Sequence, residues 1–290
     1  MFAAILIFVA VMGLVLFVAG RFGGRRGDRI VAFAYLAPTV IMLAVGLIYP
    51  GIRTIYQSFF NAAGNAFIGI DNYKTIFTSD DQLTVLRNTV FWVLVTPFVA
   101  TAVGLLYAIL VDKARLESFA KALIFLPMSI SFVAASIIWK FVYEYRPDQG
   151  NVKQIGLLNQ ILVWLGGSPQ QWLIDSPLNT FLLIIVMIWI QAGFAMTVLS
   201  AAIKAIPDDI VEAARLDGVT PVGMFRYVTL PAIRPAVVVV LTTIGIGTLK
   251  VFDIVRTMTG GQFDTSVVAN EFYSQSFRSD NQGLGAALAV

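Results

Sequence analysis

The stretch "IPDDIVEAARLDGVTPVGMF", Ile206–Phe225, is a charged insert between two strongly apolar segments. Pro207 stands near its start, Asp208 and Asp209 follow, and Gly218 closes its first half. Proline suits a first helical turn, acidic residues suit the positive end of a helix dipole, and glycine suits the residue after a helix. These signals predict a short helix with both ends specified.

The second half of the stretch repeats the start signal. Thr220 is a good N-cap, and Pro221 would take the first helical position after it. We expect a second short helix that ends before Leu230-Pro231. The pair would form a helix–turn–helix on the surface of the protein.

A plain solvated loop with a charged face would also explain the charges of this insert. It would not explain why the ends of both helices are specified, nor why Ala213 and Ala214 stand beside Glu212. Small residues let another surface come close. We therefore interpret the insert as a docking element.

The composition indicates a membrane protein. The chain is 58% hydrophobic and 13% charged, whereas a soluble domain averages about 45–50% and about 25%. It contains no cysteine and no histidine, which excludes disulfides, thiol chemistry, most zinc sites and imidazole catalysis. The net charge of +3 gives no nucleic-acid signal.

The apolar segments predict an all-α polytopic membrane protein of about seven helices. A helix needs about 20 apolar residues to cross the hydrocarbon core. Six segments meet that length, and a seventh, Gly283–Val290, starts but is too short to cross. The six predicted spans are Met1–Ala19, Ile30–Tyr49, Asn88–Val111, Ala122–Tyr143, Thr180–Ile203 and Ala236–Met258.

Lysine and arginine in the loops predict the orientation. Eleven lie in the loops after the first, third and fifth spans: Arg21, Arg25, Arg26, Arg29, Lys113, Arg115, Lys121, Lys204, Arg215, Arg226 and Arg234. Five lie in the longer loops after the second, fourth and sixth: Arg53, Lys74, Arg146, Lys153 and Arg278. The first set, with the docking insert, is predicted to be cytoplasmic and the N-terminus outside.

The first segment could be mistaken for a cleaved signal peptide. It lacks a basic start, and its flank "GRFGGRRGDR" is typical of a stop-transfer anchor. We expect Met1–Ala19 to be a retained span. The predicted organisation is an extra helix and basic loop over residues 1–29 and a transmembrane domain over 30–290, with the docking helices at about 206–230.

Two further patterns leave alternatives open. Ile155, Leu158, Leu162 and Leu165 recur at helical spacing, which predicts an amphipathic helix at the outer surface, or else a loop packed on the bundle. Trp164 and Trp172 suit such an interface. The predicted spans are also broken by prolines and glycines, which favours a moving bundle over a passive anchor: Pro38, Pro97, Pro127, Gly104, Gly193, Gly245 and Gly247.

The insert resembles a known family. "EAARLDG", nine residues and "VTLP" closely resemble the EAA signature of the permease subunits of ABC importers, with Val228 where the signature has isoleucine. The segments "FIGIDNYKTIF", "LRNTVFW", "FLPMSISFVAASIIWKFVY" and "VFDIVRTMTGGQ" are similar to the carbohydrate-uptake branch, and "FDTSVVANEFYSQSF" looks like α-glucoside, trehalose or maltose-type permeases. The resemblance covers about Tyr35 to Val290.

The resemblance implies a type I ABC importer fold and a non-catalytic transport subunit of a bacterial inner membrane. The sequence has no phosphate-binding G-x-x-x-x-G-K-[ST] loop, so no cofactor is expected on this chain, and ATP and Mg²⁺ would belong to a separate ATPase dimer. A second homologous permease and an extracytoplasmic sugar-binding protein are the other implied partners, besides membrane lipid. The residues implied to couple to the ATPase are Glu212, Ala213, Ala214, Asp217, Gly218, Met224 and Phe225.

Polar groups inside the predicted spans are the predicted sugar pathway, because such groups are costly in a membrane. They are Trp189, Gln191, Thr243, Lys250 and Asp253. An aromatic ring can stack on a sugar and an amide can bond its hydroxyls. Lys250 and Asp253, spaced i and i+3, could equally form a structural ion pair, and Trp189 could be packed in the bundle.

Three other functions remain as hypotheses. The cargo of an ABC importer could be a non-sugar solute such as glycerol phosphate. An ion-coupled secondary carrier would need carboxylates inside the membrane, and the predicted spans offer little beyond Asp253. A membrane scaffold would not need capped cytoplasmic helices or broken spans.

Overall fold

The computed structural model of the chain describes residues 2–21, 24–112, 115–147 and 156–290. Met1, Lys113, Lys153 and Ile155, which enter the predictions above, lie outside the described residues. The described part is helical, and its β pairing is limited to an isolated bridge between Phe60 and Phe67. This confirms the all-α prediction.

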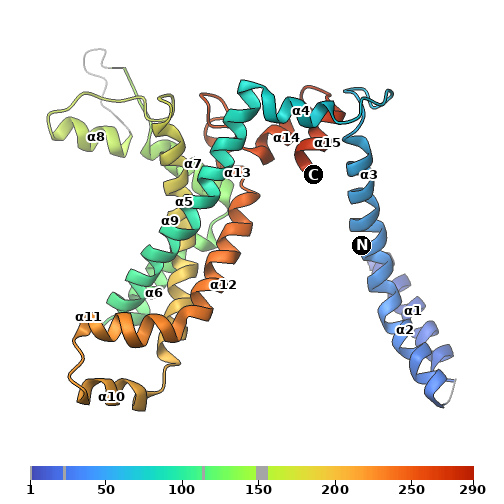
Figure 1. The fold of residues 1–290 in the computed structure, drawn as a ribbon, viewed down its shortest axis with the longest axis horizontal. Coiled ribbons are helices and arrows are strands. Elements are labelled where there is room, and N and C mark those ends of the chain that lie inside the picture. The colour runs from blue at the N-terminus through green and yellow to red at the C-terminus, as the bar shows by residue number, and fades with distance from the viewer. Residues whose placement is uncertain (1, 22–23, 113–114, 148–155) are drawn as a thin grey trace.

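The helices carry the labels of Figure 1. Three segments, η1 (Ala44–Ile48), η2 (Leu126–Ser129) and η3 (Met224–Thr229), have wider or tighter turns than an α-helix. The α-helices are α1 (Phe2–Ala19), α2 (Gly24–Leu43), α3 (Tyr49–Gln57), α4 (Asp71–Thr78), α5 (Asp80–Val111), α6 (Glu117–Phe125), α7 (Phe132–Val142), α8 (Leu157–Trp164), α9 (Leu178–Lys204), α10 (Asp208–Leu216), α11 (Pro221–Gly223), α12 (Leu230–Leu249), α13 (Asp253–Met258), α14 (Val268–Phe277) and α15 (Gln282–Ala289).

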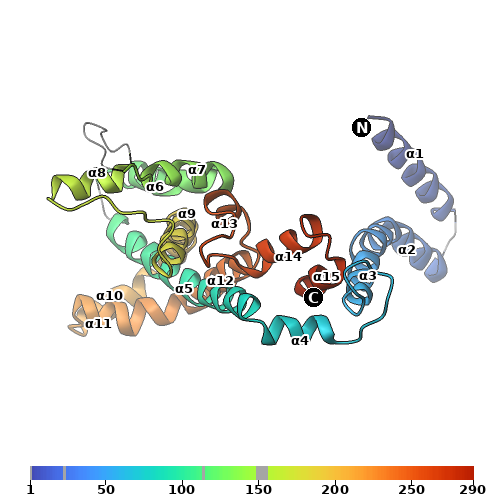
Figure 2. The ribbon, with the colours of Figure 1, turned by 90° about the horizontal axis from the view of Figure 1, so that it is seen from above.

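Helices α5, α9 and α12 form a bundle (Figures 1 and 2). The backbones of α5 and α9 touch, because a Cβ added at Gly104 would lie 2.7 Å from the Met196 nitrogen and 2.9 Å from the Ala192 oxygen. Around this contact lies a core of fully buried apolar side chains that includes Leu199 and Ile244. Glycine at position 104 is therefore what lets α5 approach α9.

Helix α6 approaches α9 in the same way. A Cβ added at Gly193 would lie 2.5 Å from the Ile124 oxygen and 2.9 Å from the Phe125 Cα. Gly245 and Gly247 of α12 differ, since a Cβ there would meet its nearest neighbours at 3.7 and 4.0 Å. Of the four glycines that the sequence singles out, two thus mark close helix contacts and two do not.

An arm of three helices stands apart from the bundle. Figures 1 and 2 show α1, α2 and α3 on the far side of a layer made by α4, α14 and α15. The apolar window of the continuous helix Val31–Gln57, which contains η1, has none of its residues buried. Gly283–Leu288 of α15 are buried in the layer, next to α3, α4 and α14. The start of the predicted seventh helix is therefore packed.

Within the described residues, four helices are long and apolar enough to cross a membrane: Val31–Gln57, Asp80–Val111, Leu178–Lys204 and Pro221–Leu249. The predicted span Thr180–Ile203 is confirmed as a helix to within two residues at each end. The predicted spans that began at Ile30 and Asn88 belong to helices that extend further, to Gln57 and from Asp80. Helix α1 forms over Phe2–Ala19, and its role as a retained span stays a prediction.

The predicted span Ala122–Tyr143 is not one straight helix, although the two helices that cover it are together apolar enough for a broken span. The chain runs as α6 and η2 to Ser129, bends by 102°, and continues as α7. Pro127 lies in the first turn of the 3₁₀ segment before the bend, and Ser131 caps α7 by accepting a hydrogen bond from the Ala134 nitrogen. Hydropathy averages over this segment and therefore misses the bend.

The predicted span Ala236–Met258 is wrong at both ends. Its helix starts at Pro221 and ends at Leu249, and α13 is a separate helix after a break. The predicted stop before Leu230-Pro231 does not occur. The wider turns of η3 precede Pro231 and take the carbonyls out of the α-helical register, so the proline ring is accommodated and the helix continues.

The contrast between the glycines gives a stability prediction. Gly104→Ala should lower the melting temperature of the purified protein, because overpacking a close contact costs about 1–3 kcal/mol. Gly245→Ala is the control, since it brings the same gain in helix propensity and meets only ordinary contact. Equal melting temperatures for the two variants would show that the α5–α9 contact is not tight.

Candidate functional site

Helix α10 lies at the end of the bundle remote from α4 and α14 (Figure 1). It follows α9 after three residues and carries Asp208 and Asp209 in its first turn, as predicted. Pro207 occupies the N-cap, one position earlier than expected, with an extended ψ of 135°. The first helix of the predicted pair is confirmed.

Gly218 ends α10 in the left-handed conformation, with φ +74°. Its nitrogen donates to the Arg215 oxygen at 3.0 Å, and the Val219 nitrogen donates to the Ala214 oxygen at 3.2 Å. These two bonds form a Schellman cap, which satisfies the last carbonyls of the helix. The turn between α10 and α11 is therefore fixed by the backbone.

The next helix begins as the sequence predicts. The Thr220 hydroxyl accepts a hydrogen bond from the Gly223 nitrogen at 3.2 Å, and Pro221 takes the first position. This helix is continuous with η3 and α12, so α10 is held between two membrane-length helices. A displacement of α10 must therefore act on both.

One face of α10 and α11 is open to solvent. Glu212 and Ala213 are exposed, and within the described residues Glu212 has no hydrogen-bond or ion-pair partner. Leu216 is 89% exposed and Val222 is 75% exposed. Sequence reasoning missed these two residues, although a large apolar residue beside a helix cap would have been a usable signal.

Met224 and Phe225 lie elsewhere than Glu212. Both are half-buried and line a cavity of about 500 Å³ together with Ile109 of α5 and Ile203 of α9. They face the base of the bundle. Of the other residues implied to couple to the ATPase, Asp217 and Gly218 are exposed and Ala214 is half-buried.

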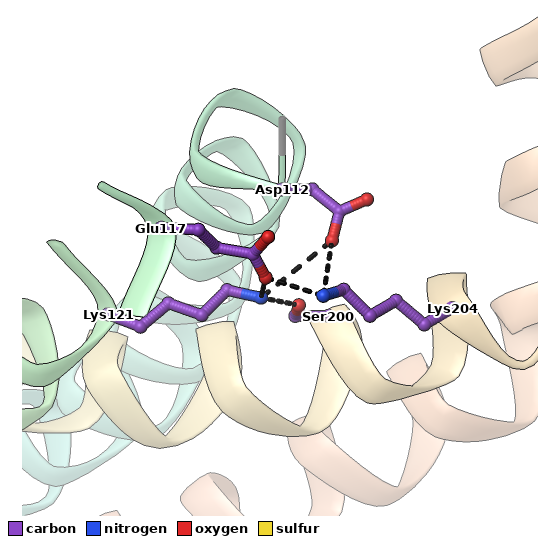
Figure 3. Close-up of polar contacts among 5 residues, drawn as sticks. All are labelled: Asp112, Glu117, Lys121, Ser200 and Lys204. Atoms are coloured by element: carbon purple, nitrogen blue, oxygen red, sulfur yellow. Dashed lines mark hydrogen bonds and ion pairs between the residues drawn. The ribbon is translucent and has the colours of Figure 1, made fainter. Parts of the chain in front are cut away.

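A cluster of four charges stands beside this cavity (Figure 3). The Glu117 carboxylate contacts the Lys121 ammonium at 2.6 Å and the Lys204 ammonium at 2.5 Å. Asp112 lies 3.7 Å and 3.5 Å from the same two groups, and Lys121 also donates to the Ser200 hydroxyl. Sequence reasoning counted these lysines only as topology signals and missed the cluster, because it joins residues far apart in the chain.

Trp189 is half-buried on the side of α9 that faces α6 and α7. It lines a cavity of about 380 Å³ with Tyr107, Pro127 and Trp139. The rings of Trp189 and Trp139 meet edge to face, with centroids 5.7 Å apart. The indole therefore belongs to an aromatic pair at the bend between α6 and α7.

The other predicted pathway residues lie elsewhere. Gln191 is half-buried beside α12, where a Cβ at Gly247 would lie 4.0 Å from its side-chain nitrogen. Thr243 is exposed on α12. The five predicted residues are not gathered in one site.

The structural ion pair between Lys250 and Asp253, the alternative to a pathway role, does not form. Both residues are described, and no ion pair joins them. Lys250 is the exposed C-cap of α12, and Asp253 begins α13 after a break in the helix. Spacing i and i+3 brings side chains together only within a continuous helix.

In the described part of the chain, no group of three or more acidic residues could hold a metal ion.

These features define a polytopic helical membrane protein with a capped, exposed helix hairpin between two spans. The chain belongs to the family of binding-protein-dependent transport system inner membrane components, which it matches over residues 100–290. It is thus a multi-pass inner-membrane permease subunit of the ABC-importer class, whose role is transport.

Two curated relatives match most of the chain. The osmoprotective compounds uptake permease protein GgtC of Synechocystis sp. is 46% identical over 88% of this chain and 91% of its own. The alpha-glucoside transport system permease protein AglF of Rhizobium meliloti is 41% identical over 93% of this chain and 82% of its own. Both relatives are permease proteins.

A solved structure confirms the fold. A chain of a bacterial ABC transporter involved in the import of the acidic polysaccharide alginate superimposes with a TM-score of 0.76. The match covers 89% of this chain and 88% of that chain at 23% sequence identity. Over the matched part of the chain, the fold is therefore that of an ABC-importer permease.

The Schellman cap predicts a conformational effect of mutation. Gly218→Val should increase hydrogen–deuterium exchange of the backbone amides of α10 severalfold, because a branched residue is strained at φ +74°. Gly218→Asn should exchange nearly as slowly as the wild-type protein, since asparagine tolerates this conformation. Equal exchange in the two variants would contradict the role of the cap.

Proposed function

We propose that this chain is one permease subunit of an ATP-driven importer for a glucoside or small oligosaccharide. It would form half of the translocation pathway and couple to a separate ATPase through α10. The observation that carries the proposal is the exposed face of α10 and α11, held between two membrane-length helices. An element of this kind can pass the movement of a docked subunit into the bundle.

The chemistry of this face supports docking to a protein. Burying a side chain such as Leu216 or Val222 contributes about 1.5–3 kcal/mol. Glu212 is available for a charged or hydrogen-bonded partner, and Ala213 beside it leaves room for close approach. The ATPase would bind ATP and Mg²⁺, for which this sequence has no phosphate loop.

The charges of the loops also give the proposed orientation. Loops rich in lysine and arginine face the cytoplasm, so we place α10 in the cytoplasm and α4, α8 and the N-terminus outside. Figure 1 supports this with α10 and α4 at opposite ends of the molecule. A binding protein would then deliver cargo to the α4 end, and a second homologous permease would complete the pathway. The arm α1–α3, which has little contact with the bundle, leaves room for such neighbours.

The relatives support a glycoside as the cargo. Beside the permease of an alpha-glucoside system, a lactose transport system permease protein of Rhizobium radiobacter is 31% identical over 88% of this chain. On α9, the indole of Trp189 and the amide of Gln191 are groups that stack on and bond to sugars. A non-sugar solute such as glycerol phosphate remains the alternative cargo for the same machinery.

An ion-coupled carrier is disfavoured. Such a carrier binds its ion at carboxylates within the membrane. In the four described helices of membrane length, acidic side chains are confined to Asp80 and Asp81, at the very start of α5, and the bent pair of α6 and α7 adds only Glu117, its first residue. The interiors of these described segments therefore offer no carboxylate for this mechanism.

The coupling role predicts a loss of assembly in two variants. Glu212→Ala and Leu216→Ser should each weaken co-purification of the ATPase and lower uptake by at least tenfold, while membrane insertion stays normal. Asp81→Ala is the matched control for co-purification of the ATPase, because it removes an exposed carboxylate at the opposite end of the molecule. Normal uptake in Glu212→Ala would exclude α10 as the coupling element.

The pathway role predicts a separate phenotype. Gln191→Leu should raise the half-saturating concentration of a glucoside for uptake into proteoliposomes by about tenfold, since a lost hydrogen bond costs about 1–3 kcal/mol. ATPase association should stay unchanged, because Gln191 lies within the bundle. Gln57→Leu, at the end of the arm, should leave uptake intact. Unchanged uptake in Gln191→Leu would place this residue among the packing residues.

A further inference from the structure

Helix α6 is fastened to α9 at two levels. Toward its C-terminal end, the α6 backbone packs against Gly193, where an added Cβ would lie 2.5 Å from the Ile124 oxygen and 2.9 Å from the Phe125 Cα. No side chain separates the two helices there. At this level α6 has no room to move toward α9.

The second fastening is the charge cluster at the N-terminal end of α6 (Figure 3). Glu117 of α6 pairs with Lys204, the last residue of α9, and Lys121 of α6 pairs with Asp112, which follows α5. Asp112 also pairs with Lys204. Lys121 also donates to Ser200, one turn before Lys204. The last turn of α9 is therefore tied to α6 immediately before the chain enters α10.

The cluster has no net charge, and its side chains are partly shielded from solvent. Two carboxylates face two ammonium groups, and the side chains of Asp112, Glu117 and Lys121 are only 20–26% exposed. Lys204 is 51% exposed and contacts both carboxylates. Removing Lys204 would leave both carboxylates with Lys121 alone.

Beyond the contact at Gly193 the chain changes direction. The C-terminal end of α6 continues through η2 into the 102° bend before α7. The cavity of about 380 Å³ lies inside this bend, lined by Leu123 and Ile124 of α6, Trp139 of α7 and Ala192 of α9. Space on the inner side of a bend is what a change of angle between α6 and α7 requires.

We propose that α6 and α9 move as one body during transport, with the bend before α7 as the hinge. Asp112, Glu117, Lys121 and Lys204 are positioning residues that tie α6 to the segment leading into α10. The inference rests on the proposed coupling role of α10: a displacement of α10 then carries α6 along and changes its angle to α7. Without the cluster, a displacement of α10 would reach α6 only through the backbone contact at Gly193.

A charge substitution tests the fastening. Lys204→Met should lower the number of cargo molecules imported per ATP hydrolysed, on the order of fivefold, as expected for a broken contact between coupled elements. Lys204→Arg should restore the ratio, because arginine keeps the charge. Arg234→Met, which removes an exposed cation on α12, is the control.

The readouts separate this inference from the proposed function. ATPase co-purification and ATP hydrolysis should persist in Lys204→Met, because the α10 face is untouched. If the wild-type chain recruits no ATPase, the proposed function fails. If the ATPase is bound and the import ratio of Lys204→Met is unchanged, the proposed function stands and the fastening is overturned.

Cross-linking tests the shared movement directly. The chain contains no cysteine, so paired cysteines can be joined selectively by a short bis-methanethiosulfonate reagent. Joining α6 to α9 through Ile124→Cys and Ala192→Cys should preserve most of the uptake measured before cross-linking. Joining α6 to α7 across the same cavity, through Leu123→Cys and Trp139→Cys, should abolish uptake. Loss of uptake with the first pair, or its survival with the second, overturns the proposal.

Discussion

The contact of two helix backbones with α9 is the constraint on which the rest of the structure depends. In a bilayer, helices gain little from hiding apolar surface from one another, so association relies on close packing at small residues. Gly104 lets α5 touch α9, and Gly193 lets α6 touch it from another side. Helix α9 is accordingly the most buried of the spans, with 61% of its apolar window inside the protein. The remaining helices are placed relative to it.

Because backbone and small side chains make the contacts along α9, the polar groups of the candidate site lie at the ends of that helix. The charge cluster and α10 stand at one end of α9. Its middle offers only groups such as Trp189 and Gln191, on different sides of the helix. The proposed coupling element and the proposed cargo-binding residues are therefore separate, and both are connected to α9.

Much of this arrangement could be predicted from the sequence, because local signals determine it. Apolar length predicts α5 and α9, and Gly218 with Thr220 predicts the turn between α10 and α11. The bend after Pro127 was missed because hydropathy reports length and not direction. The alternative ion pair of Lys250 with Asp253 would have required a continuous helix where α12 ends and α13 begins. The charge cluster joins residues up to 92 positions apart, from Asp112 to Lys204, and no local pattern indicates it.

An exposed Leu216 would contribute no burial energy to a subunit that worked alone. A leucine side chain in water loses the stabilisation that burial brings, and nothing in the cap of α10 requires an apolar residue at that position. The same cap fixes the turn rigidly through Gly218, so the exposed face is presented with little conformational freedom. A rigid apolar surface loses less entropy on binding than a flexible one. Exposure and rigidity together make sense for a helix whose surroundings are completed by another subunit.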